Sequence, residues 1–400
     1  MTINSKNYPL EGLKVLDFSR VLAGPFAGRM LCDLGADVVK VEPPEGDVTR
    51  FWGKEIANIP GYYHQQNAGK RNICIDLRAE GAVDLVNELV AEADILIENF
   101  RPDVMGRLGI GYDDLKKINP RLIMLSISGF GHNGPESRRA TYAPVVHAEA
   151  GLIHRVSRSK DSRQHFDLHD LPLSVADTNA SLHGLVGVLS AVILREKTGK
   201  GQHIDIAMID ATVATDDKIH YDLDDAWDTG PIPNEIWDLP CGPVLISTDF
   251  RLLFRRLTEH QIISDPSTPD MALEEKIRVR REVVTDLLMQ QKTLDQFDTL
   301  MKTLNIAWGE VRDPSTMADQ ITIKARGAIT EVDDRAGGKR HVTQSPYRFS
   351  DARSGVRGPA PHRGEHYIEV MQDWLGKDEK EAETLHAKNI LLWDPDWRHH

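Results

Sequence analysis

Runs of branched aliphatic residues alternate with amphipathic stretches along the first half of the chain. The short apolar runs cover residues 13–18, 37–42, 72–77, 94–98, 121–128 and 202–207 and have the length and composition of strands. The stretches at 26–34, 81–92, 112–118 and 178–198 show the helical spacing of apolar residues. This order predicts an α/β fold whose mostly parallel, Rossmann-like sheet is covered by helices on both faces.

The pattern changes after residue 225. Four prolines between 231 and 243 mark a boundary, residues 244–257 are apolar enough for one or two strands, and 272–291 and 294–304 have helical periodicity. We therefore predict a smaller α+β domain over 226–344. Residues 1–225 form the first part of a large domain, and residues 345–400 are a C-terminal segment that returns to it.

Length and charge narrow the functional classes. A chain of 400 residues exceeds the span of one hydrophobic core, and a net charge of −13 argues against nucleic acid as a partner. No apolar run is long enough to cross a bilayer, and the N-terminus lacks the layout of a signal peptide, so we expect a cytoplasmic protein without a membrane partner.

Two binding classes find little support in the sequence. The turn after the first strand, Ala23-Gly-Pro-Phe-Ala-Gly28, lacks the G-x-G-x-x-G fingerprint of dinucleotide-binding proteins. The three cysteines lie far apart, and nothing nearby completes a site for the pair His165 and His169, although their spacing of four residues suits a metal. We expect neither a metal nor a tightly bound cofactor.

Asp177 is the best single candidate for chemistry. It lies where a polar, proline-containing stretch meets the long apolar helix, so it faces the positive end of a helix dipole and free backbone N–H groups, which favour the ionised, nucleophilic carboxylate. An ordinary N-cap aspartate has the same local pattern. The local sequence alone leaves both interpretations open.

Several motifs in one order resemble family III CoA-transferases, the group of the formyl-CoA and carnitine CoA-transferases. They are Leu10-Glu-Gly-Leu-Lys-Val-Leu-Asp-Phe-Ser19, Ala23-Gly-Pro-Phe-Ala-Gly28, Leu34-Gly-Ala-Asp-Val-Val-Lys-Val-Glu42, Asn67-Ala-Gly-Lys-Arg-Asn72, Glu98-Asn-Phe-Arg-Pro102, Ser128-Gly-Phe-Gly131, Lys197-Thr-Gly-Lys-Gly-Gln202 and Gly358-Pro-Ala-Pro-His-Arg-Gly-Glu-His366. The resemblance covers nearly the whole chain and is weakest between about 212 and 343.

The resemblance implies a function for Asp177. In this family an aspartate at the start of the helix that leads into the T-G-[KR]-G-Q segment is the nucleophile, and here that position is Asp177. It would attack an acyl-CoA thioester to give a mixed anhydride and then an aspartyl-CoA thioester, and CoA would pass to an acceptor carboxylic acid. The family also implies an interlocked homodimer. Acyl-CoA and a small carboxylic acid are then the partners.

Family binding positions carry over one at a time. The resemblance assigns CoA contacts to Arg20, Ala23, Ile75, Arg78, Asn99, Phe100 and Arg107, and the acyl pocket to Leu22, Trp52, Tyr142 and His147. Among these, Arg107 resembles a phosphate-pairing arginine, a role that suits the guanidinium fork.

Three departures limit the resemblance. Leu22 stands where oxalate-using relatives have a glutamine, which speaks against oxalate, and Pro43 replaces an arginine that some relatives use on CoA phosphates. The glycine-rich loop that many relatives close over the intermediates is represented by residues 234–242, which contain one glycine. How the anhydride is shielded from water is therefore open.

Three other functions remain as alternatives. The α-methylacyl-CoA racemases of the same superfamily use a histidine where this chain has Tyr142, and His147 could take its place as the base. An intramolecular CoA-transferase acting on a diacid would use the same aspartate. A non-enzymatic CoA or nucleotide sensor would have no need for Asp177.

Overall fold

The chain divides into two compact units. The computed structural model describes residues 7–156, 168–224 and 234–394. Its contacts assign residues 1–217 and 326–400 to a larger unit and residues 218–325 to a smaller one. The boundary expected at 225/226 lies at 217/218 in this division, and the one expected at 344/345 lies at 325/326. The second shift arises because the hairpin of β12 (Ile329–Asp333) and β13 (Lys339–Thr343) belongs to the larger unit.

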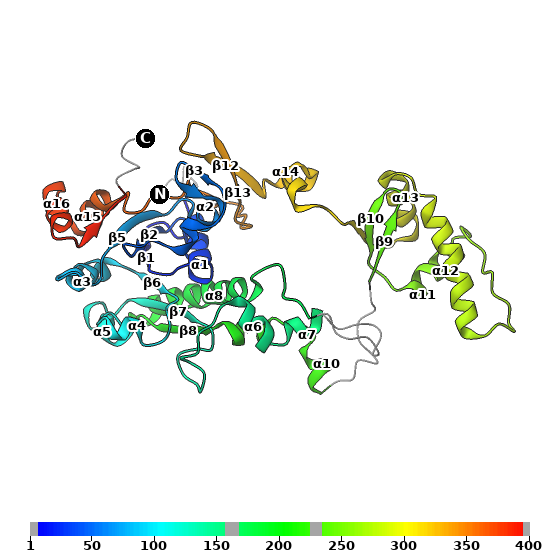
Figure 1. Cartoon of the computed structure of the whole chain (residues 1–400), viewed down its shortest axis with the longest axis horizontal. Helices are drawn as coiled ribbons and strands as arrows, with labels where there is room; N and C mark the ends of the chain where they lie inside the picture. Colours follow the sequence, from blue (N-terminus) through cyan, green and yellow to red (C-terminus); the bar gives the residue numbers. More distant parts are fainter. Residues whose placement is uncertain (1–6, 157–167, 225–233, 395–400) are drawn as a thin grey trace. The chain divides into compact units, whose positions relative to one another are not determined.

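Helices and strands alternate through most of the larger unit (Figure 1). Before the smaller unit its elements are β1 (Lys14–Asp17), α1 (Ala23–Asp33), β2 (Asp37–Glu42), β3 (Glu55–Ile56), β4 (Ile59–Pro60), α2 (Gly61–Asn67), β5 (Arg71–Ile75), α3 (Ala82–Glu92), β6 (Ile95–Glu98), α4 (Val104–Arg107), α5 (Tyr112–Ile118), β7 (Ile123–Ser128), α6 (Ala143–Glu149), α7 (Leu152–Val156), α8 (Val175–Thr198), β8 (His203–Ala207) and α9 (Met208–Ala214). After it come β12, β13, α15 (Tyr367–Leu375), α16 (Glu379–Ala387) and β14 (Leu391–Leu392).

Seven strands form the central sheet in the order β14-β5-β2-β1-β6-β7-β8. All neighbouring pairs are parallel except β14 with β5. The strand order reverses between β1 and β6, and such a switch point is where open α/β sheets usually bind their ligands. The α/β fold and the mostly parallel sheet predicted from the sequence are confirmed.

Alternate residues of the strands feed two separate cores. On one face Leu16, Val39 and Leu96 pack with α3, α5 and α15. On the other face Val15 and Ile97 pack with α1 and α8. Because every central strand is buried on both faces, it reads in the sequence as a continuous apolar run rather than an alternating one.

Helix α8 carries an apolar surface in addition to its packed face. Its buried residues include Ala180, Leu185 and Val188, whereas Val186 is 62% exposed and Ile193 is 61% exposed. By length and composition alone α8 could cross a membrane, which the sequence analysis did not expect, and 33% of its most apolar window is buried inside the protein. The core helix of a soluble protein passes the same test.

The smaller unit has an α+β arrangement. Its elements are α10 (Ile219–Leu223), β9 (Glu235–Leu239), β10 (Gly242–Ile246), α11 (Phe250–Glu259), α12 (Leu273–Met289), α13 (Leu294–Leu304), β11 (Trp308–Glu310) and α14 (Ile321–Arg326), whose last residue lies past the boundary. The antiparallel order β11-β10-β9 and helices α11 to α13 share one core. A second strand within 244–257 was predicted wrongly, since Asp249 caps a helix there by accepting the N–H of Leu252.

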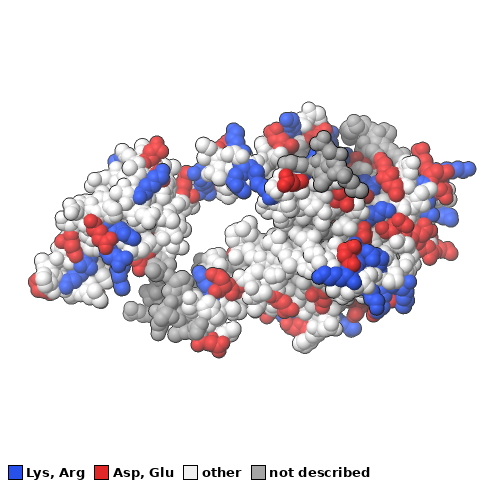
Figure 2. Space-filling view, turned by 180° about the vertical axis from the view of Figure 1, so that it is seen from behind, with Lys and Arg blue, Asp and Glu red and all other residues white. Residues whose placement is uncertain are grey.

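Charged side chains of both signs are spread over the face seen in Figure 2. Figure 2 shows Lys and Arg interspersed with Asp and Glu on the viewed face, with broad areas of other residues between them. This distribution differs from the basic stripe that nucleic-acid-binding proteins present.

Candidate active site

Asp177 lies in the first turn of α8, where it is partly buried. It is the third helical residue, and the N-cap is Ser174. The backbone N–H groups of Ala23 and of Asp177 itself lie close enough to its carboxylate to lower the pKa. Burial is the larger effect and raises the pKa of Asp177 to about 6. The expectation that the helix start favours the ionised form is therefore only partly right, although the carboxylate is still mostly ionised at neutral pH.

The other N–H groups at the start of α8 are already used. Val175 donates to the carbonyl of Leu173 at 2.9 Å, and Thr178 donates to Ser174 at 3.2 Å. Ala176 donates its N–H to Nε2 of His147 at 3.2 Å. The free donors expected from the sequence are thus occupied by the protein, and Ala23 of α1 supplies the additional donor.

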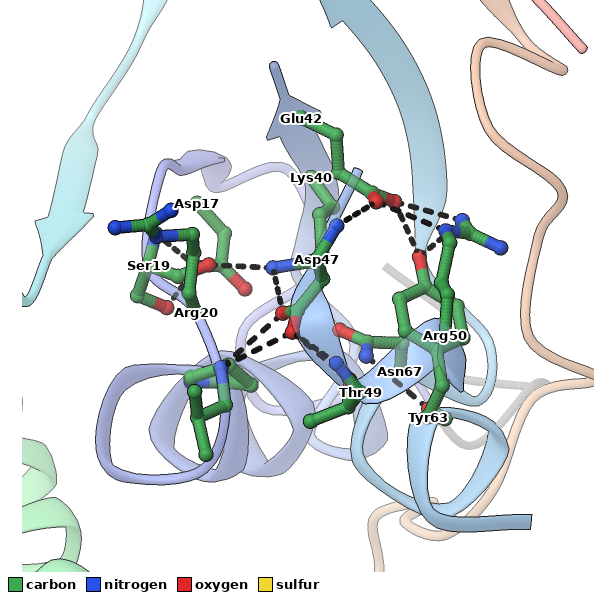
Figure 3. Close-up of polar contacts among 12 residues, drawn as sticks. Asp17, Ser19, Arg20, Lys40, Glu42, Asp47, Thr49, Arg50, Tyr63 and Asn67 are labelled. Carbon is green, nitrogen blue, oxygen red and sulfur yellow. Dashed lines mark hydrogen bonds and ion pairs between the residues drawn. The ribbon is translucent and has the colours of Figure 1, made fainter. Parts of the chain in front are cut away.

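Buried side chains fix the backbone of the turn between β1 and α1 (Figure 3). Asp17 accepts the N–H of Ser19 at 3.0 Å, and Lys40 donates to the Ser19 carbonyl. Asp47 accepts the N–H of Val21 at 3.1 Å. Val21 has φ 69°, a strained value for a β-branched residue, so these contacts hold a conformation that the isolated chain would avoid.

The charges behind the turn balance one another. Lys70 contacts Asp17 at 2.7 Å, Lys40 contacts Asp47 at 3.3 Å, and all four side chains are fully buried. Burial alone would raise the pKa of Asp17, but the two lysines lower it below its ordinary value. A paired charge network of this kind is costly to break, since one missing partner leaves a buried charge uncompensated.

Gly24 and Gly28 allow α1 to approach this network. A Cβ atom on Gly24 would lie 2.1 Å from Cβ of Ser19. A Cβ atom on Gly28 would lie 2.7 Å from Oδ2 of Asp17 and 3.3 Å from Nζ of Lys70. The two glycines are one helical turn apart, and Gly24 lets α1 lie close to Ser19 while Gly28 lets it lie close to Asp17 and Lys70.

The predicted CoA-binding turns lie next to each other at the switch point. The side chain of Asn99 accepts the N–H of Arg20 at 2.7 Å and donates to its carbonyl at 2.8 Å. The Arg20 guanidinium lies 5.3 Å from the centre of the Phe100 ring. The structure therefore brings Arg20, Asn99 and Phe100 together with Ala23, which follows in the same turn.

Other predicted CoA residues are less directly placed. Ile75 is 1% exposed, so only its backbone at the end of β5 could reach a ligand. Arg78 is exposed and already pairs with Asp76 at 2.8 Å and with Glu45 at 3.4 Å. Arg107 is an exposed residue at the end of α4.

The residues predicted to line the acyl pocket differ widely in exposure. Leu22 is buried at the N-cap of α1, and Tyr142 is 71% exposed at the N-cap of α6. The ring of Trp52 meets that of Tyr62 edge-on at 5.2 Å. Burial and then the negative charge of Asp177 raise the pKa of Tyr62 to about 12, which places this phenol close to the carboxylate. The sequence analysis missed Tyr62.

His147, which is predicted to line the acyl pocket, has hydrogen-bond partners on both ring nitrogens. It is 1% exposed, its Nδ1 lies 2.8 Å from Oδ1 of Asp170, and its Nε2 accepts the N–H of Ala176. His165 lies outside the described residues. Across the segments that the structure does describe, no group of three or more His, Cys, Asp or Glu side chains could hold a metal ion.

Comparison with known proteins gives one consistent result. A model described as CoA-transferase family III matches residues 10–367. The succinate–glutarate CoA-transferase of Agrobacterium fabrum is 30% identical over 389 residues, covering 91% of this chain and 95% of the relative. The succinyl-CoA:glutarate CoA-transferase of Mus musculus is 28% identical, covering 96% and 90%. A solved CAIB/BAIF family protein from Brucella suis has a TM-score of 0.77 and 31% identity, covering 92% and 100%.

Proposed function

The chain belongs to CoA-transferase family III and is an enzyme of the CoA-transferase type, and from this premise we propose that it moves CoA between two carboxylic acids through covalent intermediates on Asp177. The observation that carries the proposal is the position of this carboxylate. It is partly buried at the start of α8, near the Ala23 N–H. This N–H follows the turn of residues 18–22 between β1 and α1, which we call the anchored turn.

The reaction needs four exchanges at carbonyl carbon. An Asp177 oxygen attacks the thioester carbonyl, and the C–S bond breaks to give an anhydride and the CoA thiolate. The thiolate attacks the aspartyl carbonyl, which releases the donor acid as its carboxylate and leaves an aspartyl-CoA thioester. The acceptor carboxylate attacks this thioester, and the released thiolate then attacks the acceptor carbonyl. Acceptor acyl-CoA and free Asp177 result, with no net proton change.

The anchored turn suits the charge that develops in these steps. Each tetrahedral intermediate carries an oxyanion, which an N–H donor held in place before the reaction stabilises most effectively. The Ala23 N–H lies close enough to the carboxylate to lower its pKa, and the Ala23 carbonyl accepts the Ser181 hydroxyl of α8. Helices α1 and α8 are thus tied together at the reacting atoms.

The CoA molecule would enter at the switch point between β1 and β6. The exposed guanidinium groups of Arg20 and Arg107 suit its phosphates. Arg78 would have to exchange its contacts with Asp76 and Glu45 for a phosphate, so we assign it a smaller contribution. CoA is in this view a substrate and not a resident cofactor.

The acceptor is proposed to be an acid other than oxalate. Relatives of the chain are named for succinate and glutarate and others for oxalate, so Leu22 alone speaks against oxalate. Leu22, Tyr62 and Trp52 would form the wall near Asp177 and offer apolar and aromatic surface with one hydroxyl.

The geometry gives the alternatives less support. A racemase base must present a free nitrogen to the substrate carbon, whereas Nε2 of His147 is occupied by the Ala176 N–H. Intramolecular transfer in a diacid would use the same site. No contact in the described structure favours it over transfer between two acids.

A cytoplasmic, interlocked homodimer completes the proposal. The exposed side chains Leu182, Val186 and Ile193 recur on one side of α8, where they suit a protein–protein contact. Val186→Glu should lower the mass measured by sedimentation equilibrium, whereas Ile118→Glu, at an exposed apolar position of α5, should not. Equal masses for both variants and the wild type would remove α8 from the interface.

The central experiment is capture of CoA on Asp177. The protein is incubated with a panel of acyl-CoA donors, and peptides are searched by mass for aspartyl-CoA. We expect the adduct on the peptide containing Asp177 and none in Asp177→Asn. Asp210→Asn is the matched control, because Asp210 is also the third residue of its helix, α9. Full transferase activity in Asp177→Asn would refute the mechanism.

A further inference from the structure

His147 and Asp170 lie against the first turn of α8. His147 belongs to α6, and its ring is buried with Nδ1 at 2.8 Å from Oδ1 of Asp170. Its Nε2 accepts the N–H of Ala176, which is 0% exposed and directly precedes Asp177. A histidine of α6 and the segment that leads into α8 thus meet at the residue before Asp177.

The two contacts define the protonation of the ring. A nitrogen that accepts an N–H carries no proton of its own, so Nε2 is unprotonated and the ring proton is on Nδ1. Nδ1–H then donates to the Asp170 carboxylate. The acidic groups facing the ring are Asp170 and Asp177, and both ring nitrogens are engaged.

The start of α8 depends on this contact because its own cap is absent. Ser174 is the N-cap but makes no side-chain capping bond. His147 therefore does from another helix what a cap normally does from within the sequence. Without it the Ala176 N–H would be buried and unsatisfied, and the first turn would be free to shift.

We propose that His147, oriented by Asp170, is a positioning residue that holds the first turn of α8 so that the Asp177 carboxylate meets the Ala23 N–H and the substrate carbonyl in one geometry. The inference rests on the function proposed for Asp177. A displacement of about 1 Å at a reacting group can cost about a hundredfold in rate, so the effect belongs in kcat rather than in substrate binding.

Three substitutions separate the parts of the proposal. His147→Leu removes both hydrogen bonds. Asp170→Ala removes the group that orients the ring, together with the acceptor of the Leu171 N–H, at an exposed position where loss of folding is not expected. His147→Gln can keep both contacts, since an amide oxygen can accept the Ala176 N–H while its NH2 donates to Asp170.

The matched control is His386→Leu. His386 is a partly buried histidine of α16 whose Nδ1 bonds the Leu391 carbonyl, near β14 at the other edge of the sheet. It controls for general loss of a histidine contact. Thermal unfolding of all four variants shows which of them remain folded.

We expect kcat to fall by about tenfold to a hundredfold in His147→Leu and Asp170→Ala, with KM for acyl-CoA changed by less than about threefold. His147→Gln should stay within about threefold of the wild type, and His386→Leu should match it. Failure of glutamine to rescue, or a loss expressed only in KM, would overturn the positioning role.

Amide hydrogen exchange without substrate provides an independent readout. Exchange in the peptide that begins α8 should accelerate in His147→Leu and Asp170→Ala but not in His147→Gln or His386→Leu. If the wild type forms no aspartyl adduct, the proposed function fails while this measurement still tests the contact. Unchanged exchange in both His147→Leu and Asp170→Ala would refute the contact itself.

Discussion

Removing the charge of Asp177 should stabilise the protein at neutral pH while abolishing catalysis. Burial raises the pKa of this carboxyl from an ordinary 3.8 to about 6 in the folded protein. A difference of about two units corresponds to roughly 3 kcal/mol at about 1.4 kcal/mol per unit, which is the cost of keeping the carboxylate ionised in the fold. The neutral amide of the Asp177→Asn variant would avoid this cost. Natural active sites commonly sacrifice stability in this way.

The gain has an offset and a defined pH dependence. The amide oxygen of Asp177→Asn can face only one of the two backbone N–H groups that lower the pKa of the carboxyl, and loss of the other interaction costs about 1 kcal/mol. The folded state binds the proton of Asp177 more tightly than the unfolded state, so the wild type loses stability as the pH rises from about 4 to about 6. Asp177→Asn should therefore be about 1–2 kcal/mol more stable above pH 6.5 and slightly less stable below pH 4.

Unfolding midpoints measured from pH 4 to pH 8 test this prediction. Heat and urea should both rank Asp177→Asn above the wild type at pH 7.5, by a few degrees in the thermal midpoint. Asp210→Asn controls for the loss of one acidic residue in the first turn of a helix. A difference that does not change with pH, or a variant that is less stable at pH 7.5, would refute the reasoning.

Three further predictions concern the reaction and the fold around it. The rate of adduct formation should fall about tenfold per pH unit below about pH 6, because protonated Asp177 is not a nucleophile, and a flat profile down to pH 5 would contradict this. Gly24→Ala and Gly28→Ala should each lower the free energy of unfolding by at least about 1–3 kcal/mol, because the added Cβ atom would overlap buried side chains. Gly106→Ala, with nothing within 4 Å of its Cβ position, should be tolerated. Arg29→Met should cost about 3–5 kcal/mol, since it leaves the fully buried carboxylate of Asp33 without its arginine partner, and a loss under 1 kcal/mol would argue against that pairing.

The sequence predicted the parallel sheet because buried parallel strands are recognisable as local apolar runs. It failed where structure depends on distant pairing. Strand β14 has only two residues, Leu391 and Leu392, and exists because it pairs with β5. Helix α11 was partly read as strand, although Leu253 and Leu257 have helical spacing and Asp249 provides a cap. If Asp249 had been read as an N-cap, the helix would have been predicted.

Sequence motifs predicted part of the site. Asp177 and the turns at Arg20 and Asn99 come from such motifs, and the structure brings the two turns into contact. Tyr62 was missed because its proximity to Asp177 joins α2 to α8 across more than a hundred residues. In the sequence Tyr62 is recognisable only as one of two adjacent tyrosines. The structure shows that it is partly exposed, whereas Tyr63 is fully buried.

In the proposed mechanism the site combines a rigid backbone with a carboxylate nucleophile that receives few hydrogen bonds. Buried ion pairs fix the turn that offers the Ala23 N–H, so this donor needs no rearrangement when an oxyanion forms. The Asp177 carboxylate, in contrast, receives few donors, because the other first-turn N–H groups are taken by Leu173, Ser174 and His147. A carboxylate with several donors would be more stable and less reactive. Burial raises the pKa of Asp177, and because those N–H groups are diverted to other acceptors, few donors offset the rise and a lone pair stays available for the proposed attack on the thioester carbon.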